Sequence, residues 1–342
     1  MSEHRQLGRR VVLARHPEGA MQVDDFRVEN YTVPVLSDGE FLVQARYISV
    51  DPMLRLFIDK APLGGMIPPM TAGALIPGAS VGEVTASRNP DFAVGDRVEG
   101  RFGWQSLAVS NGAGVNAVSP VLGDVVNALG AGGLPGFTAY CGIVTAGGVT
   151  PDQTWLVSGA AGAVGSILGP LVRARRGRAV GIAGGPDKCR YLVDQCGYAA
   201  AVDRHSPDFH QRLAEAMPEG ADVYFDNVGG PMLADMTRYL ARGALVLICG
   251  LMSTYQADGS AQVDDRLDEV LKAVMFKGLR IQGFSQVGLD RLRPAFVEEI
   301  GALVANGDIK PDVHIRHGID SLPTAMIDLF GKGTTGKVVV CV

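Results

Sequence analysis

The sequence predicts an α/β protein with two domains, one mostly β and one built on a doubly wound parallel sheet. Its 342 residues exceed what one ordinary core accommodates, so two cores are expected. Residues 1–126 contain short β-rich segments separated by glycine and proline, whereas residues 127–310 alternate strand, turn and helix six times. The stretch 311–342 ends in another strand-like segment, GKVVVCV, which we expect to return to the first domain.

The six strands expected in the second domain are near-continuous apolar segments, as parallel strands covered by helices on both faces require. Between them, apolar residues recur at helical spacing, and glycines close the expected helices. Alternation of this kind predicts a doubly wound sheet. The expected strands are 154–158, 179–183, 199–203, 222–226, 244–249 and 280–284.

Composition indicates a globular protein without a nucleic-acid or membrane partner. Hydrophobic residues make up 47% and charged residues 20% of the chain, and no apolar run reaches the roughly 18 residues of a membrane span. The polar N-terminus does not resemble a secretory signal, and the five cysteines form no CxxC pair, so we expect a reduced, cytoplasmic protein. The net charge of −5 provides no basic surface for nucleic acid.

A glycine-rich turn follows the first strand of the second domain, in the segment TWLVSGAAGAVGS. Gly159, Gly162 and Gly165 permit a tight turn and a close backbone approach to a pyrophosphate, whose charge is met by free N–H groups at a helix N-terminus. Ala161 takes the second small position of the usual fingerprint. The strand before it and the helix after it favour a dinucleotide site over a chance spacing of glycines.

The end of the second strand favours NADPH over NADH. Ala183 and Gly184 carry no carboxylate to hold a ribose diol, although Asp187 follows closely. Lys188, and Arg204 after the third strand, offer cations to a 2′-phosphate. The alternative is that both are ordinary solvated charges.

Several longer motifs strengthen this interpretation, because together the chain resembles the prostaglandin reductase/leukotriene hydroxydehydrogenase branch of the medium-chain dehydrogenase/reductase superfamily, which includes curcumin and alkenal reductases. The resemblance implies a GroES-like β domain, a Rossmann domain, and a homodimer formed by pairing Rossmann sheet edges. It also implies an oxidoreductase that transfers hydride from NADPH to an activated alkene. The motifs that carry it are ISVDPMLR, GDRVEGRFGWQ, LPGFTAYCGI, VSGAAGAVGS, YFDNVGG and ICGLMSTY.

The resemblance also implies site residues, with three departures from the family pattern. Met53 stands where a Tyr is frequent, Arg204 replaces a Tyr after the third strand, and Thr334 replaces the Asn of a terminal NxGK. We expect Arg204 and Thr334 to contact the cofactor together with the glycines above. The other implied cofactor contacts are Ala161, Gly162, Ala163, Val164, Lys188, Asn227, Cys249, Gly250, Tyr255, Phe284, Ser285 and Gln286.

The chemistry needs a hydrogen-bond donor for the carbonyl oxygen. Hydride addition to the β-carbon of an enone gives an enolate, and a donor to its oxygen lowers the barrier. Tyr255 is the candidate, because a phenol remains protonated at neutral pH; the cofactor's ribose hydroxyl can act in its place. Met53, Met66 and Tyr255 are expected to line an apolar substrate pocket.

Three alternative functions make different demands on the sequence. A zinc alcohol dehydrogenase requires ligands that the first 140 residues lack, since they contain no cysteine and only His4 and His16. His314 and His317 lie in a strand-like segment and are better explained as surface residues, so no metal is expected. An NADPH:quinone reductase-like enzyme, and a weakly catalytic NADPH-binding structural or RNA-associated relative, remain open, although the acidic charge disfavours RNA.

Overall fold

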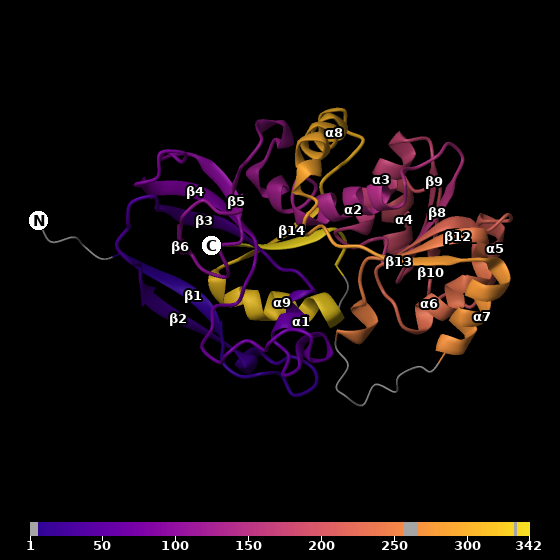
Figure 1. Cartoon of the computed structure of the whole chain (residues 1–342), viewed down its shortest axis with the longest axis horizontal. Helices are drawn as coiled ribbons and strands as arrows, with labels where there is room; N and C mark the ends of the chain where they lie inside the picture. The colour runs from indigo at the N-terminus through magenta and orange to yellow at the C-terminus, as the bar shows by residue number, and fades with distance from the viewer. Residues whose placement is uncertain (1–5, 256–265, 332–333) are drawn as a thin grey trace, which may run out of the picture. The chain divides into compact units, whose positions relative to one another are not determined.

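The computed structural model describes residues 6–255, 266–331 and 334–342. The chain divides into two compact units (Figure 1). The N-terminal unit comprises Met1–Leu129 and Val313–Val342, and the central unit comprises Gly130–Asp312. No helix among the described residues is long and apolar enough to cross a membrane.

The central unit contains a six-stranded parallel sheet in the described part of the chain, in the order β10-β9-β8-β11-β12-β13. Each strand is a short apolar segment of the kind the sequence predicts, and the strand order reverses direction between β8 and β11. The predicted doubly wound sheet is therefore confirmed. The strands are β8 (Thr154–Val157), β9 (Arg178–Ala183), β10 (Ala200–Asp203), β11 (Ala221–Asp226), β12 (Leu240–Ile248) and β13 (Arg280–Gly283).

Helices cover both faces of this sheet, because successive side chains of a strand point to opposite faces. Tyr224 of β11 packs in a core cluster with Met236 and Leu213, whereas the next residue, Phe225, meets Gly142 on the other face. Figure 1 shows α2 and α3 on one side of the strands and α6 and α7 on the other. The helices are α2 (Leu134–Thr145), α3 (Gly165–Ala174), α4 (Pro186–Gln195), α5 (Phe209–Ala216), α6 (Pro231–Met236), α7 (Leu267–Lys277) and α8 (Arg293–Ala305).

One strand boundary differs from the sequence expectation. The apolar run of β12 begins at residue 244, but the strand begins at Leu240. Arg242 and Gly243 are exposed, and the pairing register with β11 shifts in this stretch. Hydrophobic patterning misses these first residues because backbone pairing extends beyond the buried part of the strand.

The N-terminal unit is mostly β and includes both ends of the described chain. A seven-stranded sheet runs in the order β14-β15-β3-β4-β5-β7, with β6 pairing β3, and β1 and β2 form a separate antiparallel pair in the described residues. The C-terminal strand β15 pairs antiparallel with β3. The strands are β1 (Leu7–Leu13), β2 (Phe26–Thr32), β3 (Phe41–Ser49), β4 (Ser80–Ser87), β5 (Arg97–Gly100), β6 (Leu107–Ser110), β7 (Asn116–Ala117), β14 (Val313–His317) and β15 (Lys337–Cys341).

The core of this unit combines segments from both ends of the chain. Helices α1 (Leu54–Phe57) and α9 (Leu322–Gly331) contribute Leu54 and Leu322 to one buried cluster, which also contains Trp104. Figure 1 shows the yellow α9 beside the violet α1. The predicted fold class, a β domain together with a Rossmann domain, is therefore confirmed.

Candidate functional site

The glycine loop connects β8 to α3, and its glycines serve different purposes. Gly159 has a backbone φ of +56°, a left-handed conformation that residues with side chains rarely adopt. A Cβ on Gly165 would lie 2.4 Å from the carbonyl oxygen of Ala160, so α3 has no room for a side chain at its first residue. A Cβ on Gly162 would lie 3.3 Å from the oxygen of Gly159, a tight contact that a small shift relieves.

The amino end of α3 has no side-chain cap, since its N-cap residue Val164 makes no side-chain hydrogen bond. The helix dipole gives the amino end of α3 a partial positive charge, which favours an anion such as a pyrophosphate. The amides of Ser166 and Ile167 already donate to the carbonyl oxygens of Gly162 and Val164, at 2.9 Å and 3.2 Å. Within this loop, Ala161 is buried, and Ala163 and Val164 are half-buried. The predicted loop residues thus lie together at one helix end.

Asn227, which follows β11, lies beside the glycine loop. Its side-chain amide donates to the carbonyl oxygen of Ser158 at 2.8 Å, and its backbone N–H donates to Ser158 Oγ at 3.0 Å. Its Cβ lies 3.4 Å from the position that a Cβ on Gly159 would take. The structure therefore brings Asn227 and the loop together at the carboxyl ends of two neighbouring strands.

Asp226, the last residue of β11, was missed by sequence reasoning. Its carboxylate is fully buried, and Oδ1 accepts hydrogen bonds from Ser158 Oγ at 2.7 Å, Tyr224 OH at 2.9 Å, and the amides of Val228 and Gly229 at 3.0 Å each. A buried carboxylate fixes the groups that donate to it. The available signal was a charged residue at the end of an apolar strand.

The segment after β12 is bonded to the same strand end. The amides of Cys249 and Gly250 donate to the carbonyl oxygen of Asp226 at 2.8 Å and 3.1 Å. Burial, reinforced by the charge of Asp226, raises the pKa of the Cys249 thiol to about 12. Cys249 is therefore a neutral thiol at physiological pH and not a nucleophile. Its contribution to this segment is the hydrogen bond that its backbone amide donates to Asp226.

Tyr255 closes the turn η6 (Met252–Thr254) that follows this segment. Its half-buried phenol oxygen accepts the N–H of Leu251 at 3.2 Å. Burial raises the pKa of Tyr255 above the ordinary value of a phenol. The side chain therefore remains protonated at neutral pH and can donate a hydrogen bond.

Phe284, Ser285 and Gln286 follow β13 at the same edge of the sheet. The ring of Phe284 lies 5.8 Å from that of Phe225, and Ser285 Oγ accepts the N–H of Val287 at 3.1 Å. Because all strands are parallel, the ends of β8, β11, β12 and β13 carry the glycine loop, Asn227, the Tyr255 segment and Phe284–Gln286 along one edge.

The two predicted cations follow the neighbouring strands β9 and β10. Lys188 lies in the first turn of α4, and Arg204 follows β10, where its amide donates to the carbonyl oxygen of Ala183 at 2.9 Å. Burial and the charge of Arg204 lower the pKa of Lys188. Asp187, the candidate ribose ligand, forms an ion pair with Arg190.

The other predicted residues belong to the N-terminal unit. Met53 directly precedes α1 and is half-buried, and Thr334 is half-buried ahead of β15. Met66 is 80% exposed.

A buried ion pair holds the segment that leads to Met53. Lys337 Nζ lies 2.5 Å from Asp51 Oδ1 and donates to the carbonyl oxygen of Val50 at 2.9 Å. The other oxygen of Asp51 accepts a hydrogen bond from Ser49 Oγ. Sequence reasoning did not identify this pair, whose members lie 286 residues apart.

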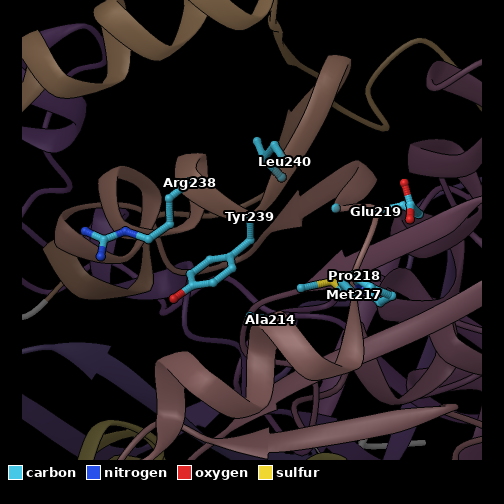
Figure 2. A pocket seen from close by; sticks show the side chains of 8 residues that line it. Ala214, Met217, Pro218, Glu219, Arg238, Tyr239 and Leu240 are labelled. Carbon is cyan, nitrogen blue, oxygen red and sulfur yellow. The ribbon is translucent and has the colours of Figure 1, made fainter.

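A hollow of about 400 Å³ lies at the opposite edge of the central sheet, where β11 and β12 begin (Figure 2). Figure 2 shows Arg238 and Tyr239 on one side of it and Pro218 and Glu219 on the other. None of the predicted site residues lines it. The lining residues are Ala214, Met217, Pro218, Glu219, Gly220, Arg238, Tyr239 and Leu240.

No group of three His, Cys, Asp or Glu side chains within residues 6–255, 266–331 and 334–342 is suited to hold a metal ion. His16 Nδ1 lies 3.0 Å from the carbonyl oxygen of Ile58, and His4 lies outside the described residues. His314 and His317 lie in β14, as expected, and are exposed.

Two family models match the chain. Residues 9–118 match a model described as the N-terminal domain of oxidoreductase, and residues 196–340 match one described as zinc-binding dehydrogenase.

Similar proteins align along nearly the whole chain. The NADPH-dependent curcumin reductase of Escherichia coli (strain K12) is 34% identical, covering 99% of this chain and 98% of that protein. Prostaglandin reductase 1 of Bos taurus is 32% identical, covering 96% and 97%. The crystal structure of CurA from Vibrio vulnificus in complex with NADPH has a TM-score of 0.90 and 32% identity, covering 98% of this chain and 99% of that one.

Proposed function

Because this chain belongs to the medium-chain dehydrogenase/reductase superfamily, in the branch of the curcumin and prostaglandin reductases, we propose that it uses NADPH to reduce the carbon–carbon double bond of α,β-unsaturated ketones and aldehydes. One structural observation carries the proposal. The glycine loop, Asn227 and the turn that bears Tyr255 are joined at the carboxyl ends of β8, β11 and β12. An anion-binding loop and a neutral hydrogen-bond donor therefore share one sheet edge.

The residues at this edge fit NADPH. The positive end of the α3 dipole, which carries no side-chain cap, suits a pyrophosphate, and Lys188 and Arg204 suit a 2′-phosphate. A relative solved with NADPH supports this cofactor. We assign the pyrophosphate to Gly159, Ala161, Gly162, Ala163, Val164 and Gly165, and the nicotinamide end to Asn227, Cys249, Gly250, Tyr255, Phe284, Ser285, Gln286 and Thr334.

When bound, NADPH supplies the hydride that adds to the β-carbon of the enone. Negative charge then develops on the carbonyl oxygen as the enolate forms, and Tyr255 donates a hydrogen bond to that oxygen. The enolate takes a proton from solvent at its α-carbon, which gives the saturated carbonyl product. Because the phenol stays protonated, it stabilises this charge without ionising. This interaction is stronger in the transition state than in the ground state, so it accelerates the reaction.

From the N-terminal unit, we propose Met53 and Met66 as substrate-binding residues that contribute apolar surface. Met53 is half-buried before α1, and the buried Asp51–Lys337 pair holds the segment that carries it. A thioether adapts to ligands of irregular shape, which suits a bulky apolar enone.

The reaction proposed here requires no zinc. A catalytic zinc is typically held by Cys, His and carboxylate ligands, and residues 1–140 contain no cysteine. The sequence therefore lacks cysteine ligands in the very domain in which zinc-dependent relatives carry theirs. Prolonged treatment with a strong chelator should leave turnover unchanged, and activity restored by added zinc would contradict the assignment.

Purified protein should oxidise NADPH in the presence of alkenals, cyclic enones or 15-oxo-prostaglandin-like ketones, and the product should be a saturated carbonyl compound. Mass spectrometry distinguishes this product from an allylic alcohol, which would overturn the proposed reaction. Activity confined to quinones would favour a quinone reductase. Retention on a nucleic-acid column without turnover would favour an RNA-associated role.

We also propose a homodimer formed by pairing the β13 edges of two central sheets. β13 is the last strand in the sheet order, and all four of its residues are exposed. The adjoining helix α7 exposes further apolar side chains, and an exposed apolar edge favours pairing with another chain. The exposed apolar residues of α7 and β13 are Leu267, Leu271, Met275, Phe276 and Ile281.

Light scattering during gel filtration should give the mass of a dimer for the wild type. Ile281→Lys and Phe276→Glu should shift the protein toward monomer, because a charge in an apolar interface loses its solvation. Val94→Lys alters an exposed valine of the N-terminal unit and should remain dimeric. A monomeric wild type would contradict the proposal.

We propose that the protein resides in the cytoplasm, because the state of its cysteines fits a reducing compartment. All five are free thiols, and burial raises the pKa of Cys141 and Cys196 to about 11 each. Such thiols are poor nucleophiles and do not form disulfides readily. Immunofluorescence or fractionation should find the protein with cytoplasmic markers, whereas recovery in a secreted fraction would contradict this.

A further inference from the structure

One buried charge of the candidate site has no part in the proposed enolate chemistry, the carboxylate of Asp226. The residue is fully buried at the end of β11, and four neutral groups donate to its Oδ1. Oδ2 is also buried and has no hydrogen-bond partner among the residues that the structure describes. The negative charge of Asp226 is therefore held by dipoles, without a cationic hydrogen-bond partner in the described chain. The four donors are Ser158 Oγ, Tyr224 OH and the amides of Val228 and Gly229.

The hydrogen bonds of Asp226 are those of an ionised carboxyl group. A protonated carboxyl group is also a donor, and when it is buried its O–H points at an acceptor. Oδ1 of Asp226 is an acceptor in each of its four bonds, and Oδ2 has no partner to which a proton could be donated. Four donors on one oxygen replace much of the hydration that a buried anion loses.

The backbone around this charge belongs to the segments assigned to the nicotinamide end of the cofactor. The carbonyl oxygen of Asp226 accepts the amides of Cys249 and Gly250 at 2.8 Å and 3.1 Å. The carbonyl oxygen of Asn227, the next residue, accepts the amide of Met252 at 3.3 Å, in the turn η6. The carboxylate therefore lies where these two segments are joined.

A neighbouring side chain responds to the same charge. After burial, which has the larger effect, the charge of Asp226 is the second cause of the raised pKa of the Cys249 thiol. Interactions between buried charges are strong because the surroundings have a low dielectric constant, and salt screens them little. The negative potential of Asp226 thus extends to the residues that follow β12.

We propose that the charge of Asp226 stabilises the positive charge that the nicotinamide ring acquires when NADPH is oxidised. This inference rests on the proposed NADPH-dependent reduction and adds an electrostatic determinant to it. The hydride carries both electrons of a C–H bond from the dihydronicotinamide to the β-carbon, which leaves one positive charge on the ring and one negative charge on the enolate. Tyr255 stabilises the enolate, and Asp226 stabilises the ring, without touching either reacting atom.

Asp226→Asn separates the charge from the hydrogen bonds. The amide oxygen of Asn keeps the acceptor position of Oδ1, and its NH₂ group takes the position of Oδ2. Dissociation constants for NADPH and NADP⁺, measured by nucleotide fluorescence and by displacement, test the proposal without turnover. NADP⁺ should bind about tenfold more weakly to the variant, as expected for loss of one buried unit charge near the ring, whereas NADPH, whose ring is neutral, should change less than about twofold.

The same change can be expressed as a potential. A tenfold change in an equilibrium constant equals about 30 mV for a two-electron couple, so the potential of the bound cofactor should become more positive by about that amount. The ratio of the two dissociation constants should also be insensitive to salt, because the phosphates of both cofactor forms are the same and the charge of Asp226 is buried.

Three further variants sharpen the test. Asp226→Ser is a second neutral replacement, which leaves no buried NH₂ group, and it should shift the ratio in the same direction. Asp222→Asn is the matched control, because Asp222 lies at the other end of β11, is exposed and accepts the amide of Thr154 at 2.8 Å. Tyr224→Phe removes a donor to Oδ1 but leaves the charge. The last two should keep the wild-type ratio, although Tyr224→Phe should lower the melting temperature.

An unchanged ratio in both neutral variants would overturn the proposal. Equal weakening of NADPH and NADP⁺ would overturn it as well, since a merely structural role of Asp226 affects both forms alike. Either result would leave enone reduction intact, because binding alone is measured. Conversely, a protein that shows the predicted shift but reduces no enone would overturn the proposed reaction and support the role of Asp226.

Discussion

At the scale of single residues, Tyr255 is the group on which the proposed reaction depends most. The phenol is half-buried, it accepts a hydrogen bond from Leu251, and burial raises its pKa. Its proton therefore persists through neutral and mildly alkaline pH, where a carboxylic acid would have ionised. A neutral donor of this kind stabilises an enolate oxygen without first having to be charged.

Tyr255→Phe should lower kcat for enone reduction by about tenfold to a thousandfold, as expected for loss of one oxyanion-type donor. The ribose hydroxyl of the cofactor can donate in its place, which favours the lower end. The NADPH dissociation constant should change little, because the ring and its packing remain. Steady-state kinetics and a fluorescence titration separate the two effects, and an unchanged kcat would exclude Tyr255 as the donor.

Lys188→Ala should raise the Michaelis constant for NADPH by about tenfold to a hundredfold, since a charge-assisted hydrogen bond contributes about 1.5 to 3 kcal/mol. The constant for NADH should hardly change, because its ribose carries no 2′-phosphate. Arg190→Ala is a suitable control, since Arg190 is exposed and paired with Asp187. Equal losses with both cofactors would mean that Lys188 supports the fold of α4 and not the phosphate.

The sequence suggests a role for a residue when its neighbours along the chain define its position. It does not do so when the role depends on contacts with segments far away in the sequence. Lys188 and Arg204 follow strands at a known offset from the glycine loop, so the sequence can propose them as phosphate contacts, and this role stays a prediction. Asp226 accepts hydrogen bonds from the residue after β8, from its own strand and from the following turn, and the linear sequence does not show that these donors converge.

At the scale of elements, two glycines of the loop differ in what a substitution should disturb, cofactor binding or folding. Gly162→Val should abolish NADPH binding while the protein remains folded, because a Cβ there meets only one carbonyl oxygen at 3.3 Å. Gly165→Ala should instead destabilise the central unit by about 1 to 3 kcal/mol, since its Cβ meets the backbone of Ala160 at 2.4 Å. Cofactor titration and thermal melts of both variants test this contrast. Normal NADPH saturation in Gly162→Val would show that the loop is misplaced.

Hydrophobic patterning succeeded for most strands of the central sheet, including β13, whose four residues are exposed. The strands β8 to β11 and β13 begin and end within a residue of their predicted bounds, because parallel strands between helices require continuous apolar runs. Patterning is weaker where a strand leaves the core. The polar start of β12 and the short, exposed β7 pair through backbone groups that any residue provides.

At the scale of the whole chain, the two ends form one unit around β3 and β15. The sequence predicts a terminal strand in GKVVVCV but cannot select its partner by periodicity, because strand pairing between distant segments depends on the complete fold. Two ion pairs connect the early and late segments of this unit. Lys337–Asp51 is buried, with side chains 3% and 12% exposed, and Arg9–Asp320 is on the surface.

Lys337→Met should lower the free energy of unfolding by about 3 to 5 kcal/mol, because it leaves the carboxylate of Asp51 buried without a counter-ion. Arg9→Ala removes the surface pair between the same parts of the chain and should cost no more than about 1 kcal/mol. Urea denaturation of both variants gives the comparison. Adding Asp51→Asn to Lys337→Met should recover part of the loss, since no charge then remains buried. Equal and small losses for the two single variants would show that the buried pair stabilises the C-terminal strand no more than a surface contact does.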